Sequence, residues 1–187
     1  RKALDMQPED IRIMHAIARH YYKNRDVDQS EQWVQKILEK RPKYFPTRLL
    51  RAEILAVQKD YDQAIEQLGQ LIEEEPRSAR AHYFKGLSHM GKGETSLAKT
   101  SFSQAIELNP GYVQARLLTA EIHMRERDFV RAEDECREIL KMIPNNYQAR
   151  LMLGNAYMAQ RKADEARQVF NALIQQEPDN PVGYSRL

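Results

Sequence analysis

The sequence predicts an all-α protein, a solenoid of stacked helix pairs that repeats every 34 residues. Two observations predict this fold. Six of the eight prolines recur at a constant spacing of 34 residues, namely Pro8, Pro42, Pro76, Pro110, Pro144 and Pro178. No stretch of strand length alternates Val, Thr and Tyr as a half-buried strand would. A fixed period of this length indicates one supersecondary unit per repeat, stacked on its neighbours.

The composition argues against several classes of function. The 187 residues include 29 Lys and Arg against 27 Asp and Glu, a formal net charge of +2. A nucleic-acid or polybasic membrane surface would need a clear excess of Lys and Arg, so we expect no nucleic acid partner. No run of 18 apolar residues occurs, so we expect no direct membrane insertion. The single cysteine, Cys136, excludes an intramolecular disulfide and a multi-cysteine zinc site.

The repeats are numbered here so that the recurrent proline occupies position 32. The complete repeats are then 11–44, 45–78, 79–112, 113–146 and 147–180. We expect residues 1–10 to be the tail of a preceding repeat and residues 181–187 to be the start of a further one. Neither end carries the polar capping helix that usually terminates a solenoid. We therefore expect one solenoid domain that is an excerpt of a longer array.

Each repeat has a small residue in both of its expected helices. Position 8 of the first helix holds Ala18, Ala52, Gly86, Ala120 and Gly154, and position 20 of the second holds Ser30, Ala64, Ala98, Ala132 and Ala166. Small residues that face each other let two helices cross at close range. The second helix also carries apolar residues at positions 24, 27 and 28, which share one helical face with position 20.

Capping residues and the proline mark where the helices begin and end. Position 16, just before the second helix, holds Asp26, Asp60 and Asp128. Position 34, just before the next first helix, corresponds to Asp10, Ser78, Asn146 and Asn180. Such side chains accept hydrogen bonds from the free backbone N–H groups of a helix start. The proline lacks a backbone N–H, so we expect it to stop each second helix.

The small residues at positions 8 and 20, the apolar positions 24 and 27, and the proline at position 32 resemble the tetratricopeptide repeat family. The resemblance covers essentially the whole chain and implies a right-handed α-solenoid of helix-turn-helix repeats. Segments 115–122 and 149–157 resemble bacterial members most closely. The chain departs from the family pattern at position 15, where the family's turn glycine survives only as Gly93.

The resemblance implies that the first helices line a concave groove for a protein or peptide partner. The groove positions of this chain are largely apolar with a ladder of methionines, which are common at adaptable binding surfaces. The expected partner-binding residues are Leu49, Glu53, Arg80, Tyr83, Leu87, Met90, Gln114, Leu117, Glu121, Met124, Gln148, Leu151, Asn155 and Met158. Apolar residues at helical spacing are also usual in cores, so positions 5 and 6 either face the groove or pack between helices.

No pattern for catalysis, nucleotide binding or metal binding is complete. Residues 86–93, GLSHMGKG, lack the final hydroxyl residue of a phosphate-binding loop, and no strand precedes them. His89 and His123 occupy equivalent packing positions, and no cysteine or carboxylate completes a ligand set with them. The carboxylate clamp of some family members is also absent, because no three consecutive repeats carry its residues. We therefore expect no enzyme activity, no cofactor and no metal.

A basic stripe follows position 4 of the first helices. Arg48, Arg116 and Arg150 recur there, with His82 between them. We expect these side chains to pair with acidic residues of the preceding second helix, or to pack their stems while the charge stays in water.

The sequence thus predicts a non-catalytic protein-interaction scaffold that binds a partner peptide or helix in its concave groove. By resemblance, we expect the parent protein to serve bacterial assembly, secretion or the cell envelope. Two alternatives stay open: a superhelix that recruits substrates for a catalytic domain outside this chain, and a self-assembly module. The sequence does not fix the compartment, because the bacterial cytoplasm and the periplasm are both compatible with it.

Overall fold

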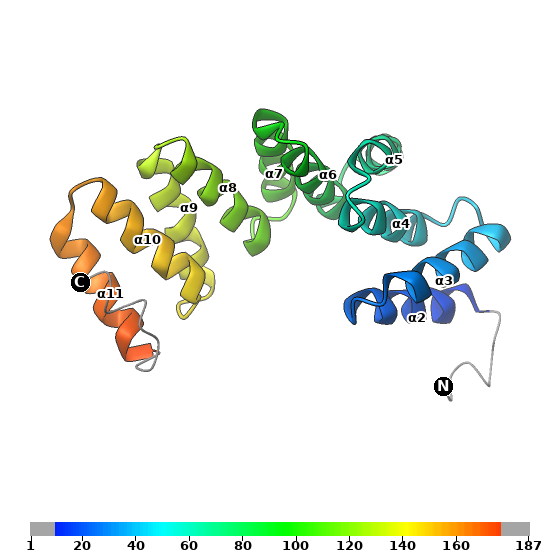
Figure 1. Ribbon diagram of the computed structural model, residues 1–187, viewed down its shortest axis with the longest axis horizontal. Coiled ribbons are helices and arrows are strands. Elements are labelled where there is room, and N and C mark those ends of the chain that lie inside the picture. Colours follow the sequence, from blue (N-terminus) through cyan, green and yellow to red (C-terminus); the bar gives the residue numbers. More distant parts are fainter. Residues whose placement is uncertain (1–9, 177–187) are drawn as a thin grey trace. The chain divides into compact units, whose positions relative to one another are not determined.

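The computed structural model describes residues 10–176, and this range contains α-helices and no strand. The described residues form ten helices in five consecutive pairs (Figure 1). The pairs are α2 (Ile11–Lys23) with α3 (Val27–Lys40), α4 (Phe45–Val57) with α5 (Tyr61–Glu74), α6 (Ala79–Gly91) with α7 (Thr95–Leu108), α8 (Val113–Arg125) with α9 (Phe129–Met142), and α10 (Tyr147–Ala159) with α11 (Ala163–Gln176). The predicted all-α array of helix pairs is confirmed.

Corresponding helices begin 34 residues apart along the chain. The second helices end before the recurrent proline, whose missing N–H cannot continue the helical hydrogen bonding. Two predicted segments lie outside the described residues: the start of a further repeat at 181–187 and, apart from Asp10, the tail of a preceding repeat at 1–10.

Capping side chains begin most helices as predicted. At position 16, a carboxylate accepts a hydrogen bond from the backbone N–H three residues later, at distances of 3.2–3.4 Å; these residues are Asp26, Asp60 and Asp128. Asp10, Ser78 and Asn146 cap α2, α6 and α10 in a similar way. Each cap satisfies an N–H group that the first helical turn leaves without an intrahelical partner, and such caps contribute about 1 kcal/mol.

The turn inside every pair contains one residue with left-handed backbone geometry, always at position 15. Its φ angle is 62° at Arg25, 68° at Lys59, 80° at Gly93, 60° at Arg127 and 62° at Arg161. Glycine adopts this geometry without steric cost, whereas for a residue with a Cβ atom the geometry is unfavourable by about 1 kcal/mol. Four of the five described turns therefore keep the glycine geometry without the glycine.

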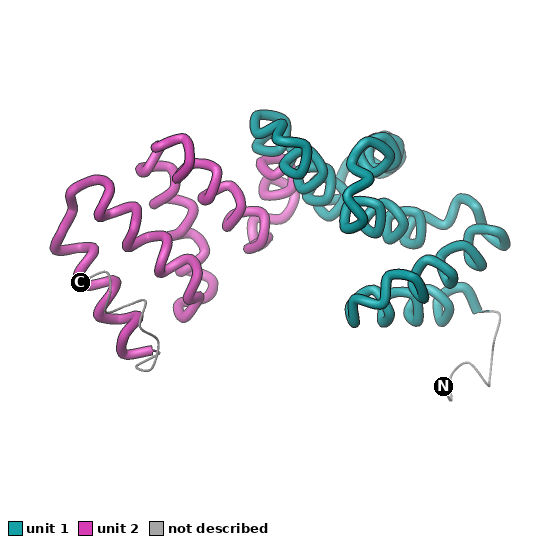
Figure 2. The backbone as a smooth tube through the Cα atoms, in the orientation of Figure 1, with its two compact units in different colours: residues 1–101 teal, residues 102–187 magenta. Residues whose placement is uncertain are grey.

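The chain divides into two compact units, residues 1–101 and 102–187, and the boundary falls inside α7 (Figure 2). Each unit has apolar cores of its own between helices. One core of unit 1 contains Val34 and Ile54, and unit 2 has a core around Cys136 that includes Phe170. These side chains are fully buried, or nearly so, and this burial favours the stacked helix pairs.

The small residues at positions 8 and 20 lie at close helix crossings. In the first pair, the Ser30 hydroxyl donates a hydrogen bond to the carbonyl oxygen of Ala18 at 2.9 Å, and both residues are fully buried. In the last pair, a Cβ atom added at Gly154 would lie 2.4 Å from Cε1 of Phe170. Larger side chains at these positions would force the two helices apart.

Candidate functional site

A buried ion pair joins two neighbouring first helices of unit 1, α4 and α6. Arg80 of α6 donates through Nε to one carboxylate oxygen of Glu53, and through Nη2 to the other at 2.7 Å. The Glu53 side chain is 0% exposed, whereas that of Arg80 is 34% exposed. Burial raises the pKa of the Glu53 carboxyl, and the hydrogen bonds from Arg80 and the nearby charge of Arg19 oppose that rise. The carboxylate is therefore held below an accessible guanidinium.

Helix α2 adds three polar side chains to this ion pair. Burial lowers the pKa of His15, and the positive charges of Arg19 and Arg80 lower it further. Burial also raises the pKa of Tyr22 to about 12, and the negative charge of Glu53 adds to that rise. The same charged groups thus act on side chains from α2, α4 and α6, so we treat His15, Arg19, Tyr22, Glu53 and Arg80 as one group, the Arg19 cluster.

Helix α6 continues this face with larger apolar side chains. The Tyr83 and Phe84 rings meet edge to face, with centroids 5.2 Å apart. The Arg80 guanidinium carbon lies 5.7 Å from the centre of the Phe84 ring. Tyr83, Leu87 and Met90 are all half-buried, so each leaves part of its side chain accessible to a partner.

Unit 2 presents a similar set of side chains on α8 and α10. Its half-buried members are Leu117, Glu121, Met124, Leu151 and Asn155, and its exposed members are Gln114, Gln148 and Met158. The Met158 side chain is 51% exposed. Glu121 accepts a hydrogen bond from Arg125 of the same helix at 2.5 Å. This face is therefore apolar along its length with polar groups interspersed.

Two of the predicted contact residues are buried inside unit 1. Leu49 is 7% exposed and packs in a core with Leu68, and Glu53 lies beneath Arg80. Helix α4 contacts both α2 and α6, and these neighbours cover the two side chains. Of the two alternatives that the sequence left open for position 5, Leu49 takes the packed one. The remaining twelve predicted residues keep accessible surface.

Three residues of the Arg19 cluster were absent from the predicted site. Arg19 and Tyr22 occupy positions 9 and 12 of the first complete repeat. The same two positions in later repeats hold Glu53 and Met90, which the sequence predicted as partner-binding residues. His15 occupies position 5, and its ring nitrogen Nδ1 lies 2.9 Å from the Thr47 hydroxyl oxygen. The repeat positions alone could therefore have indicated these side chains.

The sequence matches family models described as tetratricopeptide repeat, one over residues 34–87 and 123–185 and another over residues 85–147. The chain belongs to the tetratricopeptide repeat family. Proteins of this family generally act as protein-interaction modules rather than as enzymes. No curated protein matches the sequence.

Solved structures of other tetratricopeptide repeat proteins share the fold. MamA is 22% identical over 90% of this chain and 92% of its own, with a TM-score of 0.72. The pilF protein of Pseudomonas aeruginosa is 19% identical over 98% of this chain and 84% of its own, with a TM-score of 0.79. YrrB, described as having an unusual peptide-binding site, is 18% identical over 98% and 95%, with a TM-score of 0.69. At these identities the likeness supports the fold alone.

The position-4 arginines of this tetratricopeptide repeat chain bond within their own repeats. Arg48 donates to Glu74 at 2.8 Å, and Arg116 donates to Glu135 at 2.6 Å. Both acceptors lie in the second helix of the same pair, so the prediction of partners in the preceding second helix is wrong. The reason is geometric: the two antiparallel helices of one pair place position 4 beside its own second helix.

The position-4 side chains also contact the backbone of the loop that precedes their own helix. Arg116 Nε donates to the carbonyl oxygen of Pro110 at 2.9 Å, and Arg150 Nη2 donates to that of Pro144 at 2.5 Å. His82 Nε2 lies 3.1 Å from the Pro76 carbonyl oxygen. These contacts satisfy carbonyl groups at the ends of tetratricopeptide repeats, so the basic stripe is structural.

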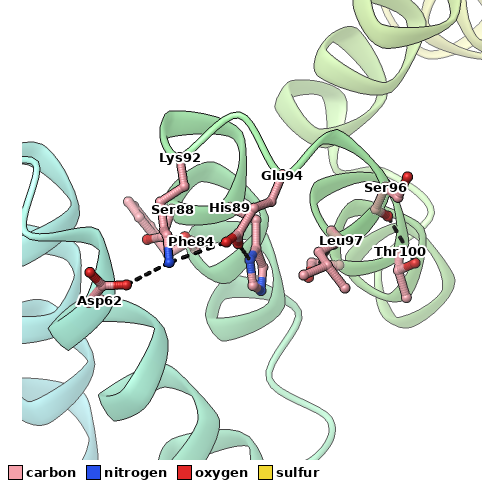
Figure 3. A network of polar contacts seen from close by, with 10 residues as sticks. Asp62, Phe84, Ser88, His89, Lys92, Glu94, Ser96, Leu97 and Thr100 are labelled. Carbon is pink, nitrogen blue, oxygen red and sulfur yellow. Dashed lines mark hydrogen bonds and ion pairs between the residues drawn. The ribbon is translucent and has the colours of Figure 1, made fainter.

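A polar network fixes the turn between α6 and α7 (Figure 3). Lys92 Nζ lies 2.6 Å from Asp62 and 3.2 Å from Glu94, and Glu94 lies 2.6 Å from Nδ1 of His89. The hydrogen bond with His89, followed by that with Lys92, lowers the pKa of the Glu94 carboxyl. His89 is 7% exposed and thus belongs to the packing of its repeat. Residues 10–176 contain no group of three or more His, Cys, Asp or Glu that could hold a metal ion.

The glycine-rich segment 86–93 has no phosphate-loop geometry. Its residues up to Gly91 are helical, and Gly93 forms the left-handed turn. A phosphate loop instead connects a strand to a helix start. Within the described part of the chain, no helix combines the length and apolar character needed to cross a membrane.

A surface hollow that the sequence did not indicate lies between α3, α4 and α5. Its volume is about 390 Å³, and its lining includes Leu38, Arg51, Glu66 and Gln67. Most of its lining residues are polar side chains typical of a solvated helix face, which explains why the hydrophobic pattern gave no signal there.

Proposed function

We propose that this chain is a non-catalytic scaffold that binds a partner peptide or helix on its first-helix faces. The observation that supports the proposal is the recurrence of half-buried apolar side chains on these helices, such as Tyr83, Met90, Met124 and Leu151. Core positions would be covered and solvated positions would be polar, whereas these side chains are large, apolar and partly accessible. An apolar centre bordered by polar groups is the usual anatomy of a peptide-binding surface.

The polar residues of the predicted site would set the orientation of the partner. Gln114 and Gln148 are the second residues of α8 and α10 and are exposed, and Asn155 is half-buried in α10. Their amides can both donate and accept hydrogen bonds, as a peptide backbone requires. Arg80 would contribute a donor of fixed geometry, because its guanidinium is anchored on Glu53.

The setting proposed for the scaffold is a bacterial assembly, secretion or envelope-related protein. The structural likeness to the pilF protein of Pseudomonas aeruginosa and to the peptide-binding YrrB motivates this proposal by analogy. A superhelix that delivers substrates to a catalytic domain elsewhere would use the same faces. A self-assembly module would instead bind a second copy of the chain.

The experiment begins with a pull-down by the 187-residue chain, with the bound proteins identified by mass spectrometry. The partner is then titrated against Tyr83→Ala and Met124→Glu variants whose helicity and melting match the unmodified protein. We expect Tyr83→Ala to weaken binding by about 1–3 kcal/mol, since aromatic side chains dominate interface energetics. Val130→Glu is the matched control, because Val130 is 60% exposed on the second helix α9.

Unchanged affinity of both variants would place the partner elsewhere, with the hollow around Arg51 as the next candidate. Capture of the chain by itself, with a concentration-dependent mass in solution, would favour the self-assembly alternative. Loss of binding in the Val130→Glu control alone would contradict the first-helix assignment.

A further inference from the structure

A continuous trough runs between the second helices of unit 1, α3 and α5, above the first helix α4. One part of it is the hollow of about 390 Å³ around Arg51, and the adjoining part has a volume of about 450 Å³. Leu38 and Arg51 line both parts, so the two hollows are contiguous. None of the proposed first-helix binding residues lines either part, so the trough is a separate surface.

The trough lies where position 7 of a first helix holds a charged residue. Thr119 and Leu153 occupy this position in unit 2, and they are buried, with 3% and 6% exposure. The corresponding residue of α4 is Arg51, which is exposed. A long charged side chain is rarely buried, so the surface above α4 stays open at this point.

The α5 wall of the trough offers unused hydrogen-bonding groups. Gln63, Gln67 and Gln70 lie on one face of this helix, four and three residues apart. Gln63 donates to Asp60 at 2.7 Å, but within residues 10–176 no hydrogen bond or ion pair engages Gln67 or Gln70. Primary amides both donate and accept hydrogen bonds, as an extended backbone requires. A helix satisfies its own backbone groups, so these amides match an extended segment better.

Both cations that line the trough already have carboxylate partners. Arg48 donates to Glu74 at 2.8 Å, and Nε of Arg51 lies 3.9 Å from a carboxylate oxygen of Glu31. An anionic ligand would therefore have to compete with carboxylates of the protein itself for these two arginines.

A carboxylate on each wall lacks a cationic partner. Glu39 lines the α3 side and accepts a hydrogen bond from Gln35 at 3.3 Å, and Glu66 lines the α5 side. Within the described part of the chain, neither carboxylate forms an ion pair. The trough thus carries an excess of negative charge, which complements Lys or Arg of a partner and disfavours an anionic one.

We propose that this trough is a second docking site, which holds an extended, basic segment of a partner protein. The segment's backbone hydrogen-bonds to Gln67 and Gln70, and a Lys or Arg side chain lies near Glu39 and Glu66. The α5 wall from Gln63 to Gln70 is about 10 Å long, which matches about three residues of an extended chain. The inference goes beyond the proposed function, because it uses none of the first-helix binding residues.

The probe is a random library of short peptides with acetylated N-termini and amidated C-termini. Peptides are selected on the unmodified protein, and those that also bind a Glu66→Lys variant are removed. We expect the remaining peptides to share a Lys or Arg at one position and to bind a Tyr83→Ala variant at unchanged affinity. Absence of any peptide that distinguishes Glu66→Lys from the unmodified protein would overturn the docking site. Remaining peptides without a preference for Lys or Arg would overturn the basic partner, and neither result bears on the first-helix face.

The matched control for Glu66→Lys is Glu73→Lys, which makes the same charge change on the same helix. Both glutamates are exposed, and Glu73 does not line the trough. We expect a selected peptide to bind Glu66→Lys about tenfold more weakly, because attraction becomes repulsion, and to bind Glu73→Lys with nearly unchanged affinity. Circular dichroism and melting should match for the two variants. Equal weakening by both would show that long-range attraction, rather than docking in the trough, holds the peptide.

N-methylation of single backbone amides in the selected peptide tests the extended conformation. We expect losses of about threefold to tenfold at every second residue, because successive N–H groups of an extended chain point to opposite sides. Losses at all consecutive residues would indicate a bound helix and would overturn the extended segment. A concentration-dependent mass of the protein that Glu66→Lys abolishes would mean that a second copy of the chain fills the trough, which would also overturn the proposal.

Discussion

Arg80 Nη2 lies 2.7 Å from an oxygen of the Glu53 carboxylate, and that carboxylate has no exposed surface. Breaking such a pair from one side leaves a buried charge without compensation, which is worse than replacing both partners. Arg80 therefore contributes to the stability of unit 1 and also belongs to the proposed partner-binding face.

The Arg80→Ala variant should be less stable than the unmodified protein by about 2 kcal/mol near neutral pH. Fully buried pairs lose about 3–5 kcal/mol, and the one-third exposure of Arg80 reduces that figure. Urea denaturation followed by circular dichroism measures the change. A double variant, Glu53→Gln with Arg80→Ala, should recover part of the loss, because it removes the buried charge.

The same variant should show a steeper dependence of stability on pH. Burial raises the pKa of Glu53 and Arg80 opposes the rise, so removing Arg80 raises this pKa further. A carboxyl with a raised pKa in the folded state contributes stability that is complete below the unfolded value of 4.5 and is lost as pH increases through the folded value. The stability difference between the two proteins should therefore grow as the pH increases from 4.5 toward neutrality. A difference that is constant over this range would contradict the prediction.

Gly154→Ala should destabilise the protein by about 1–3 kcal/mol, because the new Cβ would lie 2.4 Å from the Phe170 ring. Gly69→Ala in α5 is the matched control, since a Cβ there meets no atom within 4 Å. Alanine favours the helix over glycine by about 0.5–1 kcal/mol, so the control should gain stability. Equal shifts of the two urea midpoints would show that Gly154 is not at a close crossing.

Arg127→Gly should stabilise the protein by about 0.5–1 kcal/mol, because φ at this turn is 60°. Arg127→Ala separates the backbone effect from loss of the side chain, since alanine keeps the Cβ atom and should gain nothing. Gly93→Ala, at φ 80°, should lose stability for the converse reason. Thermal melting of the three variants checks the set, and a gain for Arg127→Ala equal to that for Arg127→Gly would refute it.

Local features of the fold could be read from the sequence because they depend on one repeat. The caps at Asp60 and Asn146 and the close contact of Ala18 with Ser30 follow from residue types at fixed spacing. The left-handed turns at Lys59 and Arg127 could not, because the family glycine is absent there and only the recurrence of the turn imposes the geometry.

The candidate site was predicted less completely because it depends on how pairs stack. Burial of Leu49 is decided by the neighbouring first helices, which no pattern within one repeat describes. The Arg19 cluster likewise joins side chains from three pairs, and Glu53 is far from Arg19 in the sequence. Repeat positions identify the residues of the first-helix face, whereas contacts between repeats decide which of these side chains stay accessible to solvent.

Cys136 should be almost unreactive toward thiol reagents in the folded protein. It is 0% exposed in the core of unit 2, and burial, with a smaller effect of Glu135, raises its pKa to about 12. The thiolate is the reactive form, so both access and ionisation limit the reaction. Labelling at about pH 8 should be slower than for an exposed thiol by at least a hundredfold, and urea should abolish the difference.

The exposed reference for this measurement is Ser103→Cys in a Cys136→Ser background, since Ser103 is exposed on α7. Because Cys136 is the single cysteine of the chain, its labelling rate reports the opening of the unit 2 core alone. Gly154→Ala should therefore accelerate the labelling, as Gly154 packs against Phe170 in that core. Arg80→Ala, which perturbs unit 1, should accelerate it less for a comparable loss of stability. Equal acceleration by the two variants would mean that both units open in one cooperative step, so that the stability of the Glu53–Arg80 pair is shared by the whole array.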